Sequence, residues 1–467
     1  MNSAGTIVSL ALLLLTGSLA AQSGQTAELW LTTADRTSLI AKQPGALEFR
    51  DAGGGAPAIS VDDSKKFQSM DGFGFALTGG SAQLLMKMDS SHRRDLLQQL
   101  FGTDGEAIGV SYLRVSIGSS DMNDHAFTYD DLAAGSTDTS LAHFDLGPDL
   151  SSVIPVLKEI LALRPTIKIL GSPWSAPAWM KTNGALKGGS LKPEDYKTYA
   201  QYLVKYLKSM QAEGIAVDAI TPQNEPLNPN NTPSTVMEAA DEGAFIAHSL
   251  GPALRKAGLK TKIVIYDHNC DRPDYPLTIL AGAKARKYVD GSGFHLYGGK
   301  ITAMTEVHNS YPKKNLYFTE QMVVDKPGSK ELAIADPVER LIIAAPRNWS
   351  RTVLLWNLAA DPEFRPHTDD GGCPVCEGAI TIDGNEAIRN LAYYTLAHAS
   401  KFVPPGSIRI ESNLLPTLSD VAFETPNGKI VLIVANGAGA DESFDIRYRG
   451  KYLSSSLKAG SVGTYVW

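Results

Sequence analysis

From Gly72 onward the chain repeats one pattern, in which a short run of apolar and β-branched residues is followed by a longer amphipathic stretch. The short runs are typical of buried strands, and the longer stretches are typical of helices that pack one face against a sheet. Eight strands are predicted, at residues 72–78, 112–119, 167–172, 219–224, 262–267, 293–296, 316–320 and 351–357. Eight alternating units predict an α/β fold, a (β/α)₈ TIM barrel.

One amphipathic stretch shows the helical period clearly. Apolar residues at 199, 202, 203, 206 and 207 follow a spacing of three and four, and a Pro-Glu-Asp start signal at 193–195 precedes them. This spacing predicts a helix that lies against the sheet. Because the βα loops of such a barrel converge at the carboxyl ends of its strands, functional residues are expected at strand ends.

The two ends of the chain show a different pattern, in which apolar and polar residues alternate between Asn and Gly turns, as in antiparallel strands. It runs through 429–435, 444–448 and 463–467 at the C-terminal end and through 46–50 and 58–61 near the start. We expect residues 28–65 and 401–467 to form one side β-sandwich domain from both termini. The barrel is then expected over residues 66–400.

The first residues bear on the cellular compartment. Residues 7–15 form an apolar run of nine, too short for the roughly 20 residues that span a bilayer. Small residues at 18, 20 and 21 suit signal-peptidase cleavage. We expect residues 1–21 to be an export signal and the mature protein to be secreted or periplasmic, without stable membrane insertion. The first basic residue is Arg36, so a positive n-region is missing, and a buried N-terminal helix is the alternative.

Composition narrows the class of partner. The 467 residues are 43% hydrophobic, which is enough for a large core, and 43 Lys and Arg against 50 Asp and Glu give a net charge of −7. No polybasic cluster occurs in the chain, so a nucleic-acid surface has no support. A neutral substrate is expected.

Three cysteines are too few for a disulfide-built fold. Cys373 and Cys376 form a lone CxxC. A zinc site would need two more ligands, and only His367 lies near in sequence. In an exported protein a local disulfide between Cys373 and Cys376 is the favoured interpretation, with free thiols or a metal site as alternatives.

Two glutamates end predicted strands in the same manner. Glu225 lies in Gln-Asn-Glu-Pro at 223–226, after the fourth strand, and Glu320 ends the seventh strand in Phe-Thr-Glu at 318–320. The two carboxyl groups can therefore face each other across one barrel. A pair of carboxyls about 5 to 5.5 Å apart is what retaining glycoside hydrolysis requires. We assign Glu225 as the acid/base and Glu320 as the nucleophile, because two close carboxylates do not both ionise readily.

Other strand ends carry side chains that fit a sugar site. Trp174 offers a ring face for a pyranose. For Trp179, a purely structural packing role has more weight than it has for Trp174. Asn224 can bond a sugar 2-hydroxyl, and Tyr297 can orient the nucleophile. Arg114, a cation inside an apolar run, needs an anionic partner, for which Glu320 is the obvious choice. The remaining candidates at strand ends are His295 and Trp356.

Five motifs together resemble glycoside hydrolase family 30, the glucosylceramidase and β-1,6-glucanase family. They are Asp-Gly-Phe-Gly-Phe-Ala-Leu-Thr at 71–78, Leu-Arg-Val-Ser-Ile-Gly at 113–118, Ser-Pro-Trp-Ser-Ala-Pro-Ala-Trp-Met-Lys-Thr-Asn at 172–183, Gln-Asn-Glu-Pro at 223–226 and Phe-Thr-Glu at 318–320. The resemblance implies a barrel with a side β-domain, a retaining mechanism, no cofactor and no metal. It agrees with the roles of Glu225 and Glu320. It also places six residues around the non-reducing sugar: Arg114, Trp174, Asn224, His295, Tyr297 and Trp356.

One departure and one similarity favour one branch of the family. Glucosylceramidase-like members carry an aspartate after the threonine of the first motif, whereas this chain reads Thr78-Gly79-Gly80. The segment Gly-Gly-Cys-Pro-Val-Cys-Glu-Gly-Ala-Ile-Thr-Ile at 371–382 is more similar to the β-1,6-glucanase branch. We therefore expect a β-1,6-glucanase acting on β-linked glucan, with a glucosylceramidase or another exo-β-glucosidase as the alternative.

Two rival classes are weaker. A non-catalytic carbohydrate-binding barrel would not need both carboxylates. A metal-dependent hydrolase built on His268, His295, His367 and Asp267 lacks any His-x-His or HExxH spacing.

Overall fold

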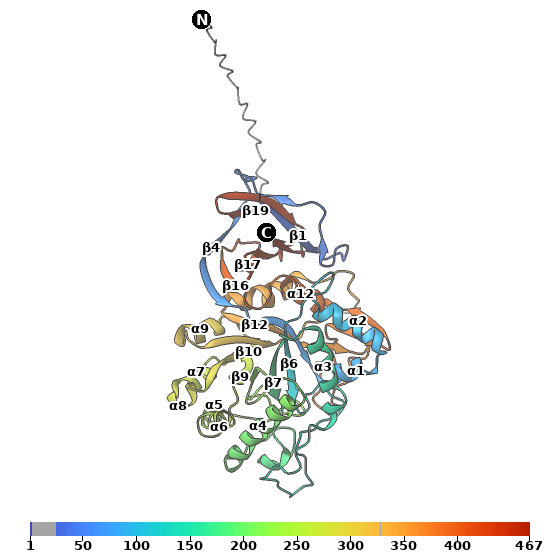
Figure 1. Ribbon diagram of the computed structural model, residues 1–467, viewed down its shortest axis with the longest axis vertical. Helices are drawn as coiled ribbons and strands as arrows, with labels where there is room; N and C mark the ends of the chain where they lie inside the picture. The colour runs from blue at the N-terminus through green and yellow to red at the C-terminus, as the bar shows by residue number, and fades with distance from the viewer. Residues whose placement is uncertain (2–24, 327) are drawn as a thin grey trace.

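The computed structural model describes residue 1, residues 25–326 and residues 328–467. Apart from its first residue, the export signal expected at 1–21 lies outside this part of the chain. Figure 1 shows a barrel with its surrounding helices below and a β-domain above, with helix α12 (Leu391–Ser400) between them. Among the described residues, no helix combines the length and hydropathy needed to cross a bilayer.

The barrel is closed by eight parallel strands, so the predicted fold class is confirmed. Its strands are β5 (Gly72–Leu77), β6 (Tyr112–Ile117), β7 (Lys168–Pro173), β8 (Ala219–Ile220), β9 (Lys262–Cys270), β10 (Val289–Gly299), β11 (Asn315–Glu320) and β12 (Ser350–Asn357). Each coincides with a predicted strand. The fourth, β8, is shorter than expected because Pro222 has no N–H to donate to the ladder.

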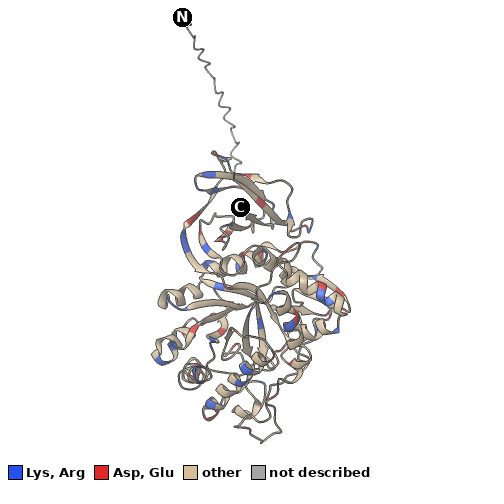
Figure 2. Cartoon of the chain, in the orientation of Figure 1, with Lys and Arg blue, Asp and Glu red and all other residues tan. Residues whose placement is uncertain are grey.

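Helices surround the strands on the outside. The α-helices besides α12 are α1 (Gly79–Lys87), α2 (Ser90–Phe101), α3 (Val153–Leu163), α4 (Tyr196–Ala212), α5 (Ala239–Phe245), α6 (Gly251–Lys256), α7 (Asp274–Ala281), α8 (Ala283–Arg286), α9 (Ala303–Ser310), α10 (Ala335–Pro337) and α11 (Ala344–Arg347). Three short 3₁₀ helices are η1 (Gly147–Leu150), η2 (Ala178–Met180) and η3 (Pro193–Asp195), and two π-helical segments are η4 (Ile246–Leu250) and η5 (Val338–Ile343). The apolar stripe predicted at 199–207 is buried on α4. In Figure 2 basic and acidic residues both occur on these outer helices.

The β-domain is built from both ends of the chain. Its strands are β1 (Thr26–Thr32), β2 (Ala41–Lys42), β3 (Leu47–Glu48), β4 (Ala58–Ser69), β16 (Ile408–Ser412), β17 (Ser419–Glu424), β18 (Ile430–Ala435), β19 (Glu442–Tyr448), β20 (Lys451–Leu457) and β21 (Val462–Val466). β1 pairs antiparallel with β21, and β4 pairs with β16. One contact departs from the antiparallel expectation, because β4 and β19 run parallel. A small sheet of β13 (Ala359–Ala360), β14 (Ile380–Asp383) and β15 (Glu386–Arg389) follows the last barrel strand.

A buried histidine joins the two domains. His398 on α12 is fully buried, with Nδ1 2.9 Å from Thr464 Oγ1 on β21 and Nε2 2.9 Å from Thr32 Oγ1 on β1. Both partners are neutral hydroxyls, so nothing compensates a charge on the ring. Burial therefore lowers the pKa of His398 to about 3.

This histidine makes the free energy of unfolding depend on pH. Below the unfolded-state pKa of about 6.5, His398 is protonated in the unfolded chain but not in the folded chain. The free energy of unfolding therefore falls as the pH drops from about 6.5 toward the folded-state pKa. The expected slope is about 1.4 kcal/mol per pH unit from this residue. Urea unfolding of His398→Gln between pH 4 and 7 should show a shallower slope than wild type. His92→Gln, on the exposed surface of α2, is the matched control, and an equal slope in His398→Gln would contradict the prediction.

Candidate active site

A cavity of about 270 Å³ lies at the carboxyl ends of the barrel strands. Its lining is Asp121, Trp174, Glu225, Asn228, Asn231, Asn269, Tyr297, Glu320, Met322, Trp356, Cys373 and Cys376. These residues lie at or after seven different strands, because the βα loops of a barrel converge on this face. The sequence-based expectation that function sits at strand ends leads to this cavity.

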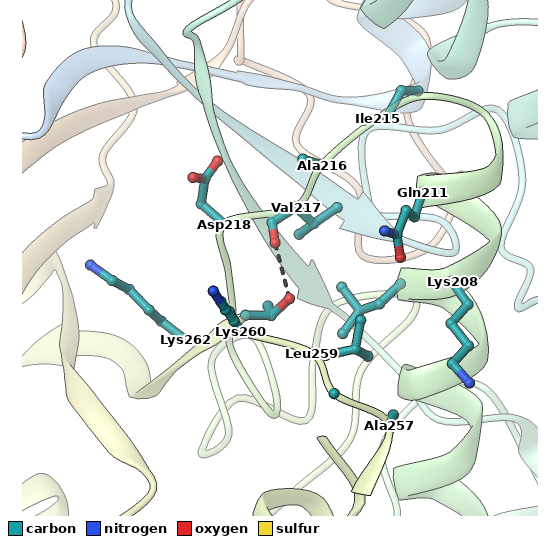
Figure 3. Close-up of a pocket in the computed structure, with 13 residues that line it drawn as sticks. Lys208, Gln211, Ile215, Ala216, Val217, Asp218, Ala257, Leu259, Lys260 and Lys262 are labelled. Atoms are coloured by element: carbon teal, nitrogen blue, oxygen red, sulfur yellow. Dashed lines mark hydrogen bonds between the residues drawn. The ribbon is translucent and has the colours of Figure 1, made fainter. Parts of the chain in front are cut away.

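A larger cavity of about 590 Å³ lies at the opposite end of the barrel (Figure 3). It is bounded by α4 and by the segments that precede β8 and β9, including Asp218 and Lys262. No aromatic side chain lines it, and its one carboxyl group, Asp218, already accepts the N–H of Ile169 at 2.9 Å. Aromatic rings and paired carboxyls are found only in the smaller of these two cavities.

Glu225 follows β8 with a backbone φ of +43°, in the left-handed region that non-glycine residues rarely adopt. Its N–H donates to the Asp267 carbonyl at 3.0 Å, which holds this turn. The carboxylate lies 3.1 Å from His295 Nδ1 and accepts Asn228 Nδ2 at 2.7 Å. Burial by itself raises the pKa of Glu225, but the hydrogen bond and charge of His295 outweigh it and lower the pKa to about 2.

Glu320 ends β11. Its Oε2 accepts Arg114 Nη1 at 2.5 Å, and its Oε1 accepts the Tyr297 hydroxyl at 3.1 Å. Burial raises the pKa of Glu320, and the charge of Glu225 adds to this, while His295 and Arg114 act in the opposite direction; the net shift is upward. Its ionisation therefore requires a higher pH than that of an exposed glutamate.

His295 lies between the two glutamates. Its Nδ1 is 3.1 Å from one oxygen of Glu225 and 3.8 Å from one oxygen of Glu320. The two carboxyl groups therefore flank the same imidazole ring and share one pocket.

Asp267, at the end of β9, is a central residue that the sequence analysis named only in a rejected metal site. It is fully buried and accepts His295 Nε2 at 3.0 Å and Arg114 Nη2 at 2.7 Å. Burial would raise the pKa of Asp267, but Arg114 and His295 hold it far below its usual range. Burial would likewise lower the pKa of His295, but the charge of Glu320 and the bonds to Asp267 and Glu225 raise it to about 9. The His295 ring is therefore protonated and positively charged at neutral pH, next to Glu225.

Arg114 on β6 is completely buried and binds two carboxylates, Asp267 and Glu320. Its second amino group also donates to Asn224 Oδ1 at 2.7 Å. The expectation of an ion pair with Glu320 thus describes part of a larger network. The side-chain oxygen of Asn224 is therefore already hydrogen-bonded to Arg114.

The two tryptophans expected to bind sugar lie together. The rings of Trp174 and Trp356 are 5.5 Å apart, and the guanidinium carbon of Arg114 lies 4.8 Å from the Trp174 ring centre. Trp179 is directed elsewhere, since its Nε1 donates to the Asp130 carbonyl at 3.1 Å and it does not line the cavity. This position fits the packing role expected for Trp179.

Asp121, in the loop after β6, also lines the cavity and was missed. Burial and the charges of Glu320 and Glu225 raise its pKa to about 8, so it is a neutral carboxyl that can donate and accept hydrogen bonds. The position at which glucosylceramidase-like members carry an aspartate is Gly79 here, where a side chain would collide with Asn123. Asp121 adds a third carboxyl to the cavity from another loop. Its place directly after the Leu-Arg-Val-Ser-Ile-Gly strand motif was the available signal.

Three metal-capable side chains, Glu225, His268 and His295, place ligand atoms within 4.8 Å of one another in the described part of the chain. However, both ring nitrogens of His295 face carboxylates. A protonated ring with both nitrogens engaged has no lone pair for a metal ion. The donor set suits proton handling better than metal binding.

A closed barrel that presents two carboxyls, a buried arginine and a tryptophan pair at its strand ends defines a glycoside hydrolase. Residues 70–403 match the glycosyl hydrolase family 30 TIM-barrel domain, and residues 406–465 match the family's β-sandwich domain. The chain belongs to glycosyl hydrolase family 30.

Individual relatives cover nearly the whole chain. An endo-1,6-β-D-glucanase of Neurospora crassa is 34% identical over 429 residues, 87% of this chain and 88% of that protein. The lysosomal acid glucosylceramidase of Mus musculus is 28% identical and covers 91% of this chain and 85% of its own. A solved endo-β1,6-glucanase structure superposes with a TM-score of 0.86 at 31% identity and covers 95% of this chain and 99% of its own.

Proposed function

We propose that this family 30 hydrolase cleaves β-1,6-linked glucan with retention of anomeric configuration. The observation that carries the mechanism is the placement of Glu225 and Glu320 on either side of His295 in one cavity. The choice of substrate is supported by the β-1,6-glucanases among the relatives, which are more similar in sequence than the glucosylceramidase.

In the first step Glu320 attacks the anomeric carbon and the glycosidic C–O bond breaks. Arg114 and Tyr297 both donate to the Glu320 carboxylate, so they orient it and favour its anionic form. Glu225 delivers a proton to the leaving oxygen. The products are a free sugar end and a glycosyl ester on Glu320.

The acid proton is held by the Glu225–His295 pair, since His295 Nδ1 faces Glu225 across 3.1 Å. Asp267 keeps the His295 ring positively charged until negative charge develops on the leaving oxygen. Once Glu320 is esterified its negative charge is gone, which lowers the proton affinity of its neighbours. Glu225 then takes a proton from water, and the water oxygen breaks the ester.

Trp174, Trp356 and Asp121 line the cavity and surround the sugar in this proposal. Asn224 is bound to Arg114 through its side-chain oxygen, which leaves only its amide N–H groups for a sugar hydroxyl. The tryptophan pair offers an apolar face, and Asp121 offers hydrogen bonds to hydroxyl groups. This combination of one apolar face and several polar groups suits a neutral sugar.

The test of the substrate is a panel of pustulan, laminarin, xylan, glucosylceramide and an aryl β-glucoside with the purified protein. Pustulan, a β-1,6-glucan, is expected to give the highest kcat/KM, and NMR of the first product should show the β-anomer. Good turnover of the lipid with none of pustulan would move the protein to the glucosylceramidase alternative. Loss of activity in EDTA would favour the metal-dependent alternative.

We further propose that the protein is exported. The apolar run at 7–15 with small residues after it supports this, as does the Cys373–Cys376 pair, whose sulfurs are bonded in the structure.

A further inference from the structure

The CxxC pair singled out in the sequence lies in the wall of the active-site cavity. Cys373 and Cys376 are joined by a disulfide in the segment 361–379, between β13 and β14. Both cysteines line the same cavity as Glu225 and Glu320. Nothing in the proposed chemistry uses them, so their position calls for a separate explanation.

The segment is fixed at both ends of the disulfide. On one side the Cys376 carbonyl accepts Asn357 Nδ2 at 3.1 Å, and Asn357 is the last residue of β12, the strand that carries Trp356. On the other side Thr368 N–H donates to the Asp121 carbonyl at 2.9 Å, and Thr368 Oγ1 donates to the Thr232 carbonyl at 2.9 Å. The segment therefore extends from the loop of Asp121 to the loop that follows Glu225.

The disulfide packs against the tryptophan pair. Cys376 is 2% exposed and belongs to one apolar cluster with Trp174 and Trp356, against which Cys373 and Met322 also pack. Cys376 Sγ lies 3.8 Å from Met322 Sδ. Between the cysteines, Val375 is 50% exposed, an apolar side chain left open on the segment that forms the wall.

We propose that the Cys373–Cys376 disulfide is a substrate-positioning element that backs the tryptophan pair and holds the pocket in the shape that binds a glucosyl unit, with Val375 as an apolar contact for the bound glucan. The proposal rests on the proposed glucan hydrolysis. The covalent link fixes four residues of the wall, so the tryptophan rings meet a rigid surface rather than a mobile loop. A preorganised wall reduces the ordering cost of binding.

The test compares oxidised wild type, wild type reduced by excess dithiothreitol, and Cys373→Ser/Cys376→Ser. In the reduction the S–S bond breaks, each sulfur takes up one electron and one proton, and the reagent closes to its own cyclic disulfide. KM for a β-1,6-gluco-oligosaccharide should rise about 5-fold or more while kcat changes less than about 2-fold, because sugar binding is lost and the acid–base groups are untouched. Unchanged KM in both forms would overturn the proposal.

Two controls separate this effect from general damage. Cys270, buried in β9, is already a free thiol and offers nothing to reduce, so among the described residues the reagent acts on the Cys373–Cys376 disulfide alone. Val375→Ser should also raise KM, whereas Ile388→Ser, an aliphatic residue that is 58% exposed on β15 and lies outside the disulfide loop, should leave it unchanged. Equal changes in KM for Val375→Ser and Ile388→Ser would contradict a specific contact between Val375 and the bound glucan.

The outcomes distinguish the two proposals. Oxidised wild type that fails on every β-1,6-glucan refutes the proposed substrate, and the same comparison on the β-glucoside that it does cleave still decides the role of the disulfide. If the double serine variant unfolds, the reduced wild type gives the answer, with its circular dichroism as the check on folding.

Discussion

Glu320→Gln is expected to lower turnover of every β-glucoside by about 10⁴-fold or more, because the amide cannot form the glycosyl ester. The amide keeps the size of the side chain and can still contact Tyr297, so the thermal unfolding midpoint should stay close to that of wild type. Steady-state kinetics on an aryl β-glucoside measure the loss. Turnover within about tenfold of wild type would mean that Glu320 is not the nucleophile.

Glu225→Gln separates the two roles. General acid–base catalysis contributes about 10² to 10⁴-fold, and an aryl leaving group that needs no proton should recover most of the first step. Added azide should then accelerate turnover and give a β-glycosyl azide, because a small anion replaces the water that Glu225 would activate. The reversed stereochemistry, an α-glycosyl azide from the Glu225 variant and a β-glycosyl azide from the Glu320 variant, would exchange the two assignments.

Asp267→Asn is expected to have the second largest effect, on stability and on the pH profile together. The variant leaves the buried cations Arg114 and His295 short of one counter-charge, and breaking a buried pair in this way costs about 3 to 5 kcal/mol. Urea unfolding measures this loss. The pH dependence of kcat/KM measures the second effect.

The direction of the pH effect follows from His295. In wild type the pKa of His295 is raised to about 9, so the acid proton is retained through neutral pH and the basic limb of the profile lies on the alkaline side. The acidic limb reflects ionisation of Glu320, whose pKa is also raised. Without Asp267 one cause of the raised His295 pKa disappears, and the basic limb should move to lower pH.

Asp218→Asn is the matched control for this variant. Asp218 is a half-buried aspartate that lies beside the large cavity at the other end of the barrel (Figure 3). Its pKa is raised by burial, and it faces Lys168 and Lys262 rather than the active site. An unmoved pH profile is expected, so a shift of the same size in Asp218→Asn would show that the effect of Asp267→Asn is not local.

Local pattern was sufficient to predict the barrel. Each βα unit carries its own apolar run and its own amphipathic stretch, so every strand could be located from a window of a few residues. Glu225 and Glu320 were found by the same means, because each follows such a run directly. The predicted length of β8 was too great. Pro222 interrupts the hydrogen-bond ladder only if its nitrogen faces a neighbouring strand, and the local pattern does not reveal which way the nitrogen faces.

The residues that tune the site were harder to predict. Asp267 and Asp121 also follow strands, but their importance comes from contacts across the barrel with Arg114 and the two glutamates. Those contacts join residues more than a hundred positions apart in some cases, and nothing in a local pattern encodes them. Glu225 and Asp267 both have a positive φ, and the hydrogen bond from the Glu225 N–H to the Asp267 carbonyl again joins residues far apart in the sequence.

The pairing of β1 with β21 has a consequence for biogenesis. The first strand of the β-domain is synthesised before the barrel, whereas its antiparallel neighbour, Val462–Val466, is synthesised after it. The whole barrel is made between the two. Until β21 has been made, the edge of β1 that pairs with it stays open, and an open edge invites association with other chains.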